Sequence, residues 1–342
     1  MRNYWTSALV AIIGICLGYY FHGVEGAFIV AILGVLEVSV SFDNAVFNAK
    51  ILQNMSVFWQ NLFLWLGILI AVVGVRLVLP VLIVAVTANL GFIETANMVF
   101  NDTASYSKHL DEASTAITAF GGMFLLMIFL DFLFDPEKEH HWLGGVERLM
   151  SRFGVHQTMS SMVALVVLIG VSLGLEDSKI GTFLFAGVFG IALYFVMGLL
   201  KSAFEDKDTG EAVVNTIKRG GFMSFLYLEV VDASFSLDGV IGAFAMSNDP
   251  IIIMIGLAIG AWFVRSITLH LVREGVLKQL VFLEHGAHYA IGVLGVIMLC
   301  HNFMHVPEMF TGLAGAILIA LAIFSSFRHK KAVGNTEGTA TA

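Results

Sequence analysis

Long apolar segments separated by short polar stretches run through almost the whole chain. Ten of them approach the length needed to cross a hydrocarbon core of about 30 Å, which takes roughly 20 helical residues. They lie near residues 4–21, 26–51, 57–88, 112–134, 158–174, 182–200, 221–246, 250–275, 284–305 and 308–327. These segments lack the alternation of barrel strands, and a helix satisfies its own backbone polar groups in lipid. The pattern predicts an all-α polytopic membrane protein with about ten transmembrane helices.

The third segment is longer than a bilayer requires and contains Pro80. Proline removes one helical hydrogen bond and clashes with the preceding turn. We therefore expect this segment to kink or to continue beyond the membrane.

Composition and charge agree with a membrane protein and suggest its orientation. The chain is 58% hydrophobic and 13% charged, with a mean hydropathy of +0.87, which excludes an ordinary soluble domain and a disordered chain. With the N-terminus in the cytoplasm, 14 of the 18 lysines and arginines fall on the inner side and two on the outer side. This asymmetry predicts that both termini are cytoplasmic. The net charge of −8 is spread over loops, so the lipid bilayer, and not nucleic acid, is the expected partner.

Two short acidic stretches inside apolar segments resemble one another. Residues 37–46 read EVSVSFDNAV and residues 232–241 read DASFSLDGVI, with a carboxylate first, serines third and fifth, and aspartate seventh. Each motif is followed by an apolar segment in which a glycine stands nine residues before an arginine, Arg76 in one case and Arg265 in the other. Weaker matches link the fourth segment with the ninth and the fifth with the tenth.

These matches predict two halves of five helices each. The halves are residues 1–180 and 181–330, followed by a disordered cytoplasmic tail over 331–342. Because five is odd, the halves enter the membrane from opposite sides, and such inverted repeats place a transporter's substrate near the midplane at the repeat interface. The competing interpretation is that small residues recur by chance in membrane helices.

The first motif places Glu37, Ser41 and Asn44 on one helix face, since these residues are four and then three positions apart. Asp43 points elsewhere on a regular helix. It joins the same site only if the helix is broken near Ser41, and serine, asparagine and aspartate do compete for helical hydrogen bonds.

The second motif repeats this arrangement. Glu229, Asp232 and Ser236 share a face, and Asp238 joins them only if the helix is broken near Ser236. Broken helices recur at the ion sites of transporters.

Six carboxylates in the apolar segments outnumber the two arginines. They are Glu37, Asp43, Glu229, Asp232, Asp238 and, near the inner end of the fourth helix, Asp131. The four without a cationic partner must be protonated, face water or hold a cation. Carboxylate, amide and hydroxyl oxygens suit Mn²⁺, Mg²⁺ or Ca²⁺ better than Zn²⁺ or Cu⁺.

Two other interpretations of these carboxylates remain open. Asp43 and Asp238 could pair with Arg76 and Arg265 purely to hold the halves together. The carboxylates could instead carry protons, alone or as the coupling ion for a metal.

The two motifs and the arginine-bearing helices after them resemble the TerC family of integral membrane proteins, and a longer bacterial branch of it in particular. The likeness covers roughly residues 26–90 and 221–300. The family is associated with tellurium resistance and with manganese export. The resemblance implies that the metal-facing residues are Glu37, Asp43, Asn44, Glu229, Asp232 and Asp238, with Ser41, Ser236, Arg76, Arg265 and Asp131 as supporting residues. The chain departs from the family in its ten-span length.

We therefore expect a transporter of a divalent cation, with Mn²⁺ favoured, that works by alternating access around the paired motifs. A structural or partner-binding membrane protein in metal or tellurite stress is the main alternative. A membrane-embedded metal-dependent enzyme is disfavoured, because the chain lacks a His-Glu-x-x-His motif.

His285 and His288 share a face at the inner end of the ninth helix, where a metal-loading role competes with a purely structural one. Oligomeric state does not follow from the sequence.

Overall fold

The computed structural model describes residues 4–138, 140–153, 158–205, 221–233, 243, 249–275, 280–304, 306 and 308–340. Within these ranges the chain is helical and contains no strand. The helices are α1 (Trp5–Val40), α2 (Phe42–Leu52), α3 (Val57–Leu69), the π-helix η1 (Ile70–Val78), α4 (Leu79–Thr87), α5 (Phe92–Asn101), α6 (Thr103–Phe134), α7 (Gly145–Phe153), α8 (Met159–Ser172), α9 (Asp177–Glu205), α11 (Pro250–Arg273), α13 (Leu283–Cys300) and α14 (Glu308–Ala340). Residues 221–233 are also helical.

Seven of these helices are long and apolar enough to cross a membrane. The all-α membrane-protein class is thereby confirmed. The count of ten crossings and the inverted relation of the halves stay predictions. The predicted boundary at residue 180 falls in the first turn of α9, which begins at Asp177.

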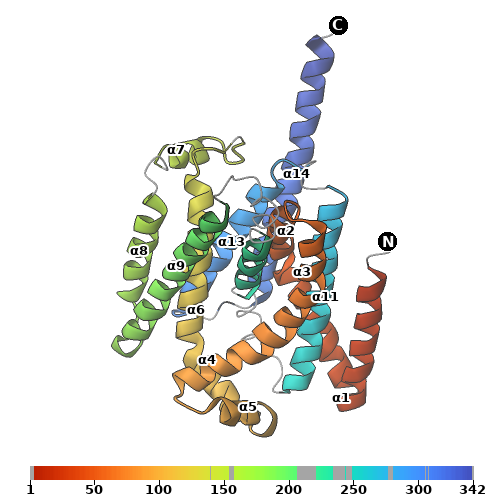
Figure 1. Ribbon diagram of the computed structural model, residues 1–342, viewed down its shortest axis with the longest axis vertical. Coiled ribbons are helices and arrows are strands. Elements are labelled where there is room, and N and C mark those ends of the chain that lie inside the picture. The colour runs from red at the N-terminus through yellow and green to blue at the C-terminus, as the bar shows by residue number, and fades with distance from the viewer. Residues whose placement is uncertain are drawn as a thin grey trace.

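Helix α1 folds back on itself and so accounts for the first two predicted segments. His22 has φ −134° and ψ 23°, and Gly23 has φ 62° and ψ −147°, a conformation open to glycine because it has no Cβ. The two arms then lie against each other, since a Cβ added to Gly18 would be 2.9 Å from the carbonyl oxygen of Gly26. One continuous apolar stretch thus forms a hairpin (Figure 1).

The third predicted segment contains α3, η1 and α4 in succession. The departure from regular α-helix lies in the π-helical stretch Ile70–Val78, directly before Pro80 at the start of α4. Pro80 has no N–H to bond the carbonyl of the residue four positions earlier, Arg76. The predicted irregularity is therefore present, and it extends through the residues that carry Arg76.

Two further segments differ from expectation. Residues 92–111, which lie between the third and fourth predicted segments, form α5 and the start of α6. There the Asp102 side chain accepts a hydrogen bond from the N–H of Ser105 at 3.3 Å. Helix α14 continues to Ala340, through residues for which the sequence predicted no regular structure. That stretch begins with lysine and alanine, which are good helix formers.

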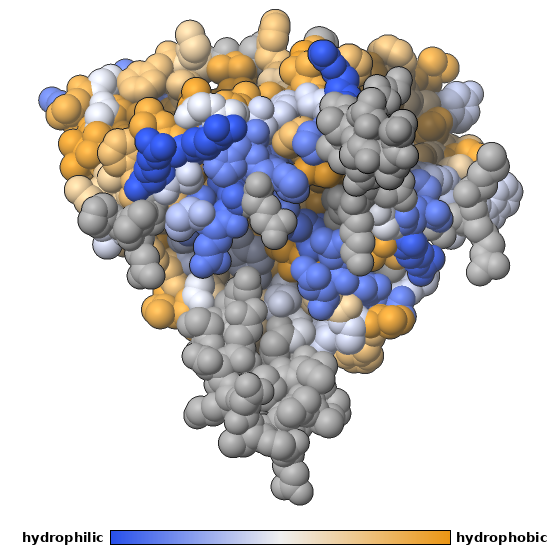
Figure 2. Space-filling model, turned by 90° about the horizontal axis from the view of Figure 1, so that it is seen from above, coloured by the Kyte–Doolittle hydropathy of each residue, from blue (hydrophilic) through white to orange (hydrophobic). Residues whose placement is uncertain are grey.

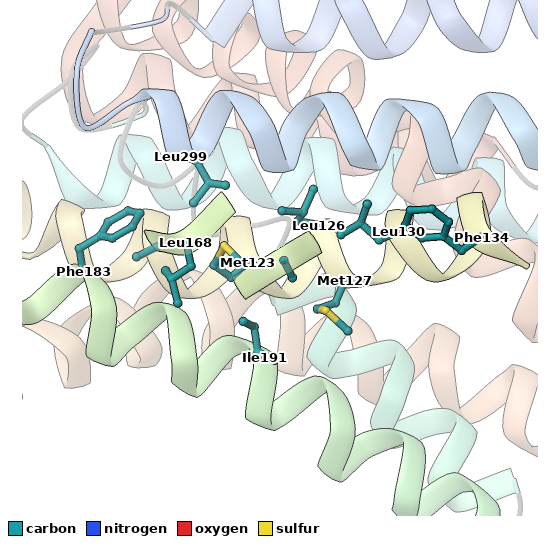
Figure 3. Packing of buried hydrophobic residues seen from close by; sticks show 11 residues of the cluster. Met123, Leu126, Met127, Leu130, Phe134, Leu168, Phe183, Ile191 and Leu299 are labelled. Carbon is teal, nitrogen blue, oxygen red and sulfur yellow. The ribbon is translucent and has the colours of Figure 1, made fainter. Parts of the chain in front are cut away.

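The core is centred on α6, which lies between α9 and α13 (Figure 1). Figure 3 shows Met123 of α6 beside Leu168 of α8, and Leu126 on the side of α6 that faces α13. Helices α6 and α13 approach closely at Gly122 and Gly295. A Cβ added to Gly122 would lie 3.1 Å from the carbonyl oxygen of Gly295, and a Cβ added to Gly295 would lie 3.1 Å from the carbonyl oxygen of Gly122. Small residues at such a crossing let membrane helices pack without a hydrophobic driving force.

The surface has the distribution expected of a membrane protein. Large apolar side chains are exposed along the sides of the bundle, for example Tyr20 of α1 at 80% and Phe185 of α9 at 77%. On the end that carries α7, hydrophilic residues gather in the middle and hydrophobic ones surround them (Figure 2). An apolar belt of this extent indicates contact with lipid.

Candidate metal-binding site

A cluster of buried polar side chains lies where α1, α2, η1, residues 221–233 and α11 meet. The first motif supplies Glu37, Ser41 and Asn44, which are 4%, 5% and 2% exposed. The Ser41 hydroxyl donates to Glu37 Oε1 at 3.0 Å, which confirms that these residues share a face. The helix is interrupted between α1 and α2 at Ser41, whose φ is −96° and ψ is 14°. A break here is the condition that the sequence set for Asp43 to join the site.

Arg76 is the cationic partner of Glu37. One of its terminal nitrogens donates to Glu37 Oε1, and the other donates to the carbonyl oxygen of Ala71 at 2.8 Å. Ala71 lies five residues earlier in the π-helix η1, a type of helix that is rare and often found at functional sites. Both side chains of the pair are almost fully buried, at 4% and 3% exposure.

The second half places two carboxylates beside one arginine. Arg265 Nη2 lies 3.8 Å from Glu229 Oε1 and 3.7 Å from Asp232 Oδ2. Its other terminal nitrogen donates to the carbonyl oxygen of Phe63, and its guanidinium carbon lies 4.2 Å from the centre of the Phe63 ring. Neither oxygen of Glu229 has a hydrogen-bond partner in the described part of the chain.

A hydrogen bond between described side chains joins the two motifs. The Asn44 side-chain amide donates to Asp232 Oδ1 at 2.7 Å, across 188 positions of sequence. The two motifs therefore meet at Asn44 and Asp232. That acidic side chains of both motifs hold a metal ion together stays a prediction.

Glycines make room for this cluster. A side chain on Gly67 of α3 would collide with Glu229 and Arg265, and one on Gly260 of α11 would collide with the Cβ and Cγ of Glu37. The charged side chains can approach the neighbouring helices closely only because these positions lack a Cβ.

Not every predicted residue joins the cluster. Asp238 and Ser236 lie outside the described residues, and Asp43 is in α2 with a side chain outside the described part. Asp131 of α6 accepts a hydrogen bond from Tyr194 of α9. Where the structure describes them, the arginines pair with Glu37, Glu229 and Asp232, while any pairing with Asp43 or Asp238 stays untested.

Sequence reasoning missed two contributors to the cluster's surroundings. Phe63 offers both a carbonyl and a ring to Arg265, and no local signal marks an ordinary phenylalanine for this role. Asn48 is 2% exposed and its Oδ1 has no hydrogen-bond partner among the described atoms. Its position one turn after Asn44 could have identified it.

The inner-end histidines have protein partners. A ring nitrogen of His285 lies 2.8 Å from the oxygen of His140 and 3.5 Å from Glu147. His288 lies 2.9 Å from the oxygen of Glu284 through Nδ1 and stacks on Phe132 with ring centres 4.0 Å apart. These contacts support a structural role.

The side chains of the cluster can be compared with those that a transported metal ion would need as ligands. Among the described residues, no group of three or more His, Cys, Asp or Glu side chains is arranged to hold a metal. Glu229 and Asp232 do offer hard oxygen ligands next to the amide of Asn44, the donor type that Mg²⁺, Ca²⁺ and Mn²⁺ prefer. In this conformation Arg265 occupies the place beside them.

No curated protein and no solved structure matches the chain. Residues 42–333, most of the sequence, match the family described as "Protein of unknown function (DUF475)". The matched region begins after Glu37 and includes Asn44, Arg76, Glu229, Asp232 and Arg265. The chain belongs to the DUF475 family.

Proposed function

We propose that this protein is a membrane transporter that exports a divalent metal cation, Mn²⁺ in the favoured case, by alternating access between two inverted halves. The observation that carries the proposal is the buried cluster in which Asn44 of one motif bonds Asp232 of the other, beside more carboxylates than guanidinium groups.

Charge accounting supports a cationic cargo. Glu37 has Arg76 to itself, whereas Glu229 and Asp232 share Arg265. This leaves one carboxylate in excess among the described side chains, and the sequences of the two motifs also contain Asp43 and Asp238. A buried carboxylate without a partner is costly, so a metal ion or a proton is expected to neutralise the excess.

Arg265 supplies a mechanism for release. Its guanidinium compensates Glu229 and Asp232 at 3.7–3.8 Å, longer than a direct charge-assisted hydrogen bond. A divalent cation that takes this place gains two carboxylates and displaces the guanidinium. Re-formation of the arginine contacts then favours release of the cation, with protons as the candidate coupling ion.

Corresponding contacts in the two halves support the inverted repeat. In each half the arginine pairs with a carboxylate of its own half, Arg76 with Glu37 and Arg265 with Asp232. The glycine nine residues earlier packs on the other half. Gly67 packs on Glu229, and a Cβ on Gly256 would lie 2.5 Å from that of Leu33.

Transport by the purified protein in vesicles tests the proposal. We expect Mn²⁺ flux, followed with an enclosed metal-sensitive dye, to fall by about tenfold or more in Glu229→Gln/Asp232→Asn, the change that ~1.4 kcal/mol of lost stabilisation produces. The exposed Asp111→Asn serves as a matched control and keeps its flux. Competition with Mg²⁺ and Ca²⁺ ranks the cargoes.

A structural membrane protein is the second candidate, because the Glu37–Arg76 pair is already complete without a cation. Equal flux through wild-type vesicles, variant vesicles and vesicles without protein would support this candidate and reject transport.

A further inference from the structure

Helix α7 lies outside the membrane-crossing segments, at the end of the bundle from which α14 projects (Figure 1). It packs against α6 and is anchored through Glu147, which is 0% exposed. Glu147 accepts hydrogen bonds from the N–H groups of Trp142 and Leu143 at 3.0 and 3.2 Å and from the Tyr289 hydroxyl at 2.8 Å. These three hydrogen bonds to one buried carboxylate hold α7 in a defined orientation.

The outward side of α7 carries an apolar stripe. Val146, Leu149 and Phe153 are 58%, 49% and 46% exposed, and their spacing of three and then four residues puts them on one face. Met150 turns inward and packs on the core. No described part of the chain covers the stripe.

Two arginines flank this stripe. Arg148 and Arg152 are both exposed and lie one turn apart, so they project together on a neighbouring sector of the helix. An apolar stripe beside a basic sector is the pattern of helices that lie in the plane of a membrane surface. The next helix, α8, also exposes apolar side chains, namely Met162, Leu165 and Val166.

We propose that α7 is an in-plane membrane-surface helix that inserts Val146, Leu149 and Phe153 at the headgroup boundary and binds anionic phospholipid headgroups through Arg148 and Arg152. The charge of the arginines selects the partner, since the cytoplasmic leaflet is negatively charged and the positive-inside distribution places α7 on that side. The site is independent of metal transport.

The depth of α7 is the first test. A fluorophore on Leu149→Cys, in protein whose Cys16 and Cys300 are replaced by serine, is expected to be quenched by lipids brominated on their acyl chains. The same fluorophore on Glu94→Cys, in α5 at the opposite end, is the control and stays unquenched. A Leu149 label quenched only by a water-soluble agent would overturn the proposal, and quenching by a second labelled copy instead of lipid would assign the stripe to a dimer.

Headgroup binding is the second test. Added to the protein in neutral detergent, short-chain phosphatidylglycerol is expected to raise the midpoint of thermal unfolding, whereas phosphatidylcholine and free glycerol phosphate leave it unchanged. Arg148→Gln/Arg152→Gln loses most of the rise, and Arg148→Lys/Arg152→Lys retains it. The control variant Lys108→Gln/Lys179→Gln removes the same amount of positive charge from the predicted outer side and is expected to keep the full rise in the unfolding midpoint. An equal rise in the Arg→Gln variant, or with glycerol phosphate alone, overturns headgroup binding at α7.

Discussion

Buried charged side chains in this protein depend closely on their partners, and Glu37 is the clearest case. Its side chain is 3% exposed and accepts from both Arg76 and Ser41. Arg76→Met leaves Glu37 buried without a cation, and loss of one member of a buried pair costs about 3–5 kcal/mol. We expect a large fall in unfolding temperature in detergent, with partial recovery in Glu37→Gln/Arg76→Met.

The exposed pair of Glu176 and Lys179 is the control for this measurement. Its atoms are 3.4 Å apart and its side chains are 75% and 46% exposed. Glu176→Gln is expected to change stability by less than about 1 kcal/mol. An Arg76→Met variant as stable as the wild type would contradict the pairing seen here.

Glu147 yields a second prediction for a single residue. Glu147→Gln preserves the size of the side chain but replaces one acceptor oxygen with a donor, which faces N–H and O–H groups that also donate. A buried group left unsatisfied costs about 1–3 kcal/mol. Hydrogen exchange should rise in residues 142–153 and stay unchanged in α5, and unchanged exchange in both would show that Glu147 does not hold α7.

The helices depend on small residues where they cross. Gly260 of α11 lies against the Cβ and Cγ of Glu37, atoms that cannot move without the α1 backbone. Gly260→Ala is therefore expected to cost about 1–3 kcal/mol through overpacking and to displace Glu37 from Arg76. Gly170→Ala in α8, where a Cβ meets nothing within 4 Å, is the matched control for unfolding measurements. Equal stability of the two variants would argue against tight packing at Gly260.

At the scale of the whole molecule, polar side-chain contacts join the predicted halves at opposite ends. His22 pairs with Asp249 near the turn of the α1 hairpin, and Lys50 pairs with Glu284 at the start of α13. Alternating access, as proposed above, requires each end to open in turn. A cysteine pair at 22 and 249, cross-linked in protein without other cysteines, should stop metal flux, and reduction should restore it. The single cysteine variants are the controls, and undiminished flux through the cross-linked protein would rule out movement at that end.

The local patterns of the sequence were reliable where the physics is local. The shared face of Glu37 and Ser41 follows from helical periodicity. From the sequence, the interruption at Ser41 is only a condition for Asp43 to join the site, and its physical reason is the competition of short polar side chains for backbone hydrogen bonds. The π-helix around Arg76 was only half predictable, because Pro80 marks an irregularity without indicating its extent.

Taken alone, the sequence determined the membrane class, the helical secondary structure and the two acidic motifs, because apolar length and residue spacing act over one or two helical turns. Only the tertiary structure decided that Arg76 pairs with Glu37, that Glu229 and Asp232 share Arg265, and that Asn44 reaches Asp232. These partners are 33 to 188 positions apart. Whether they meet depends on how each helix is rotated about its axis and on how closely neighbouring helices approach. Glycines such as Gly67 and Gly260 permit the close approach. The local spacing of residues encodes neither the rotation nor the approach.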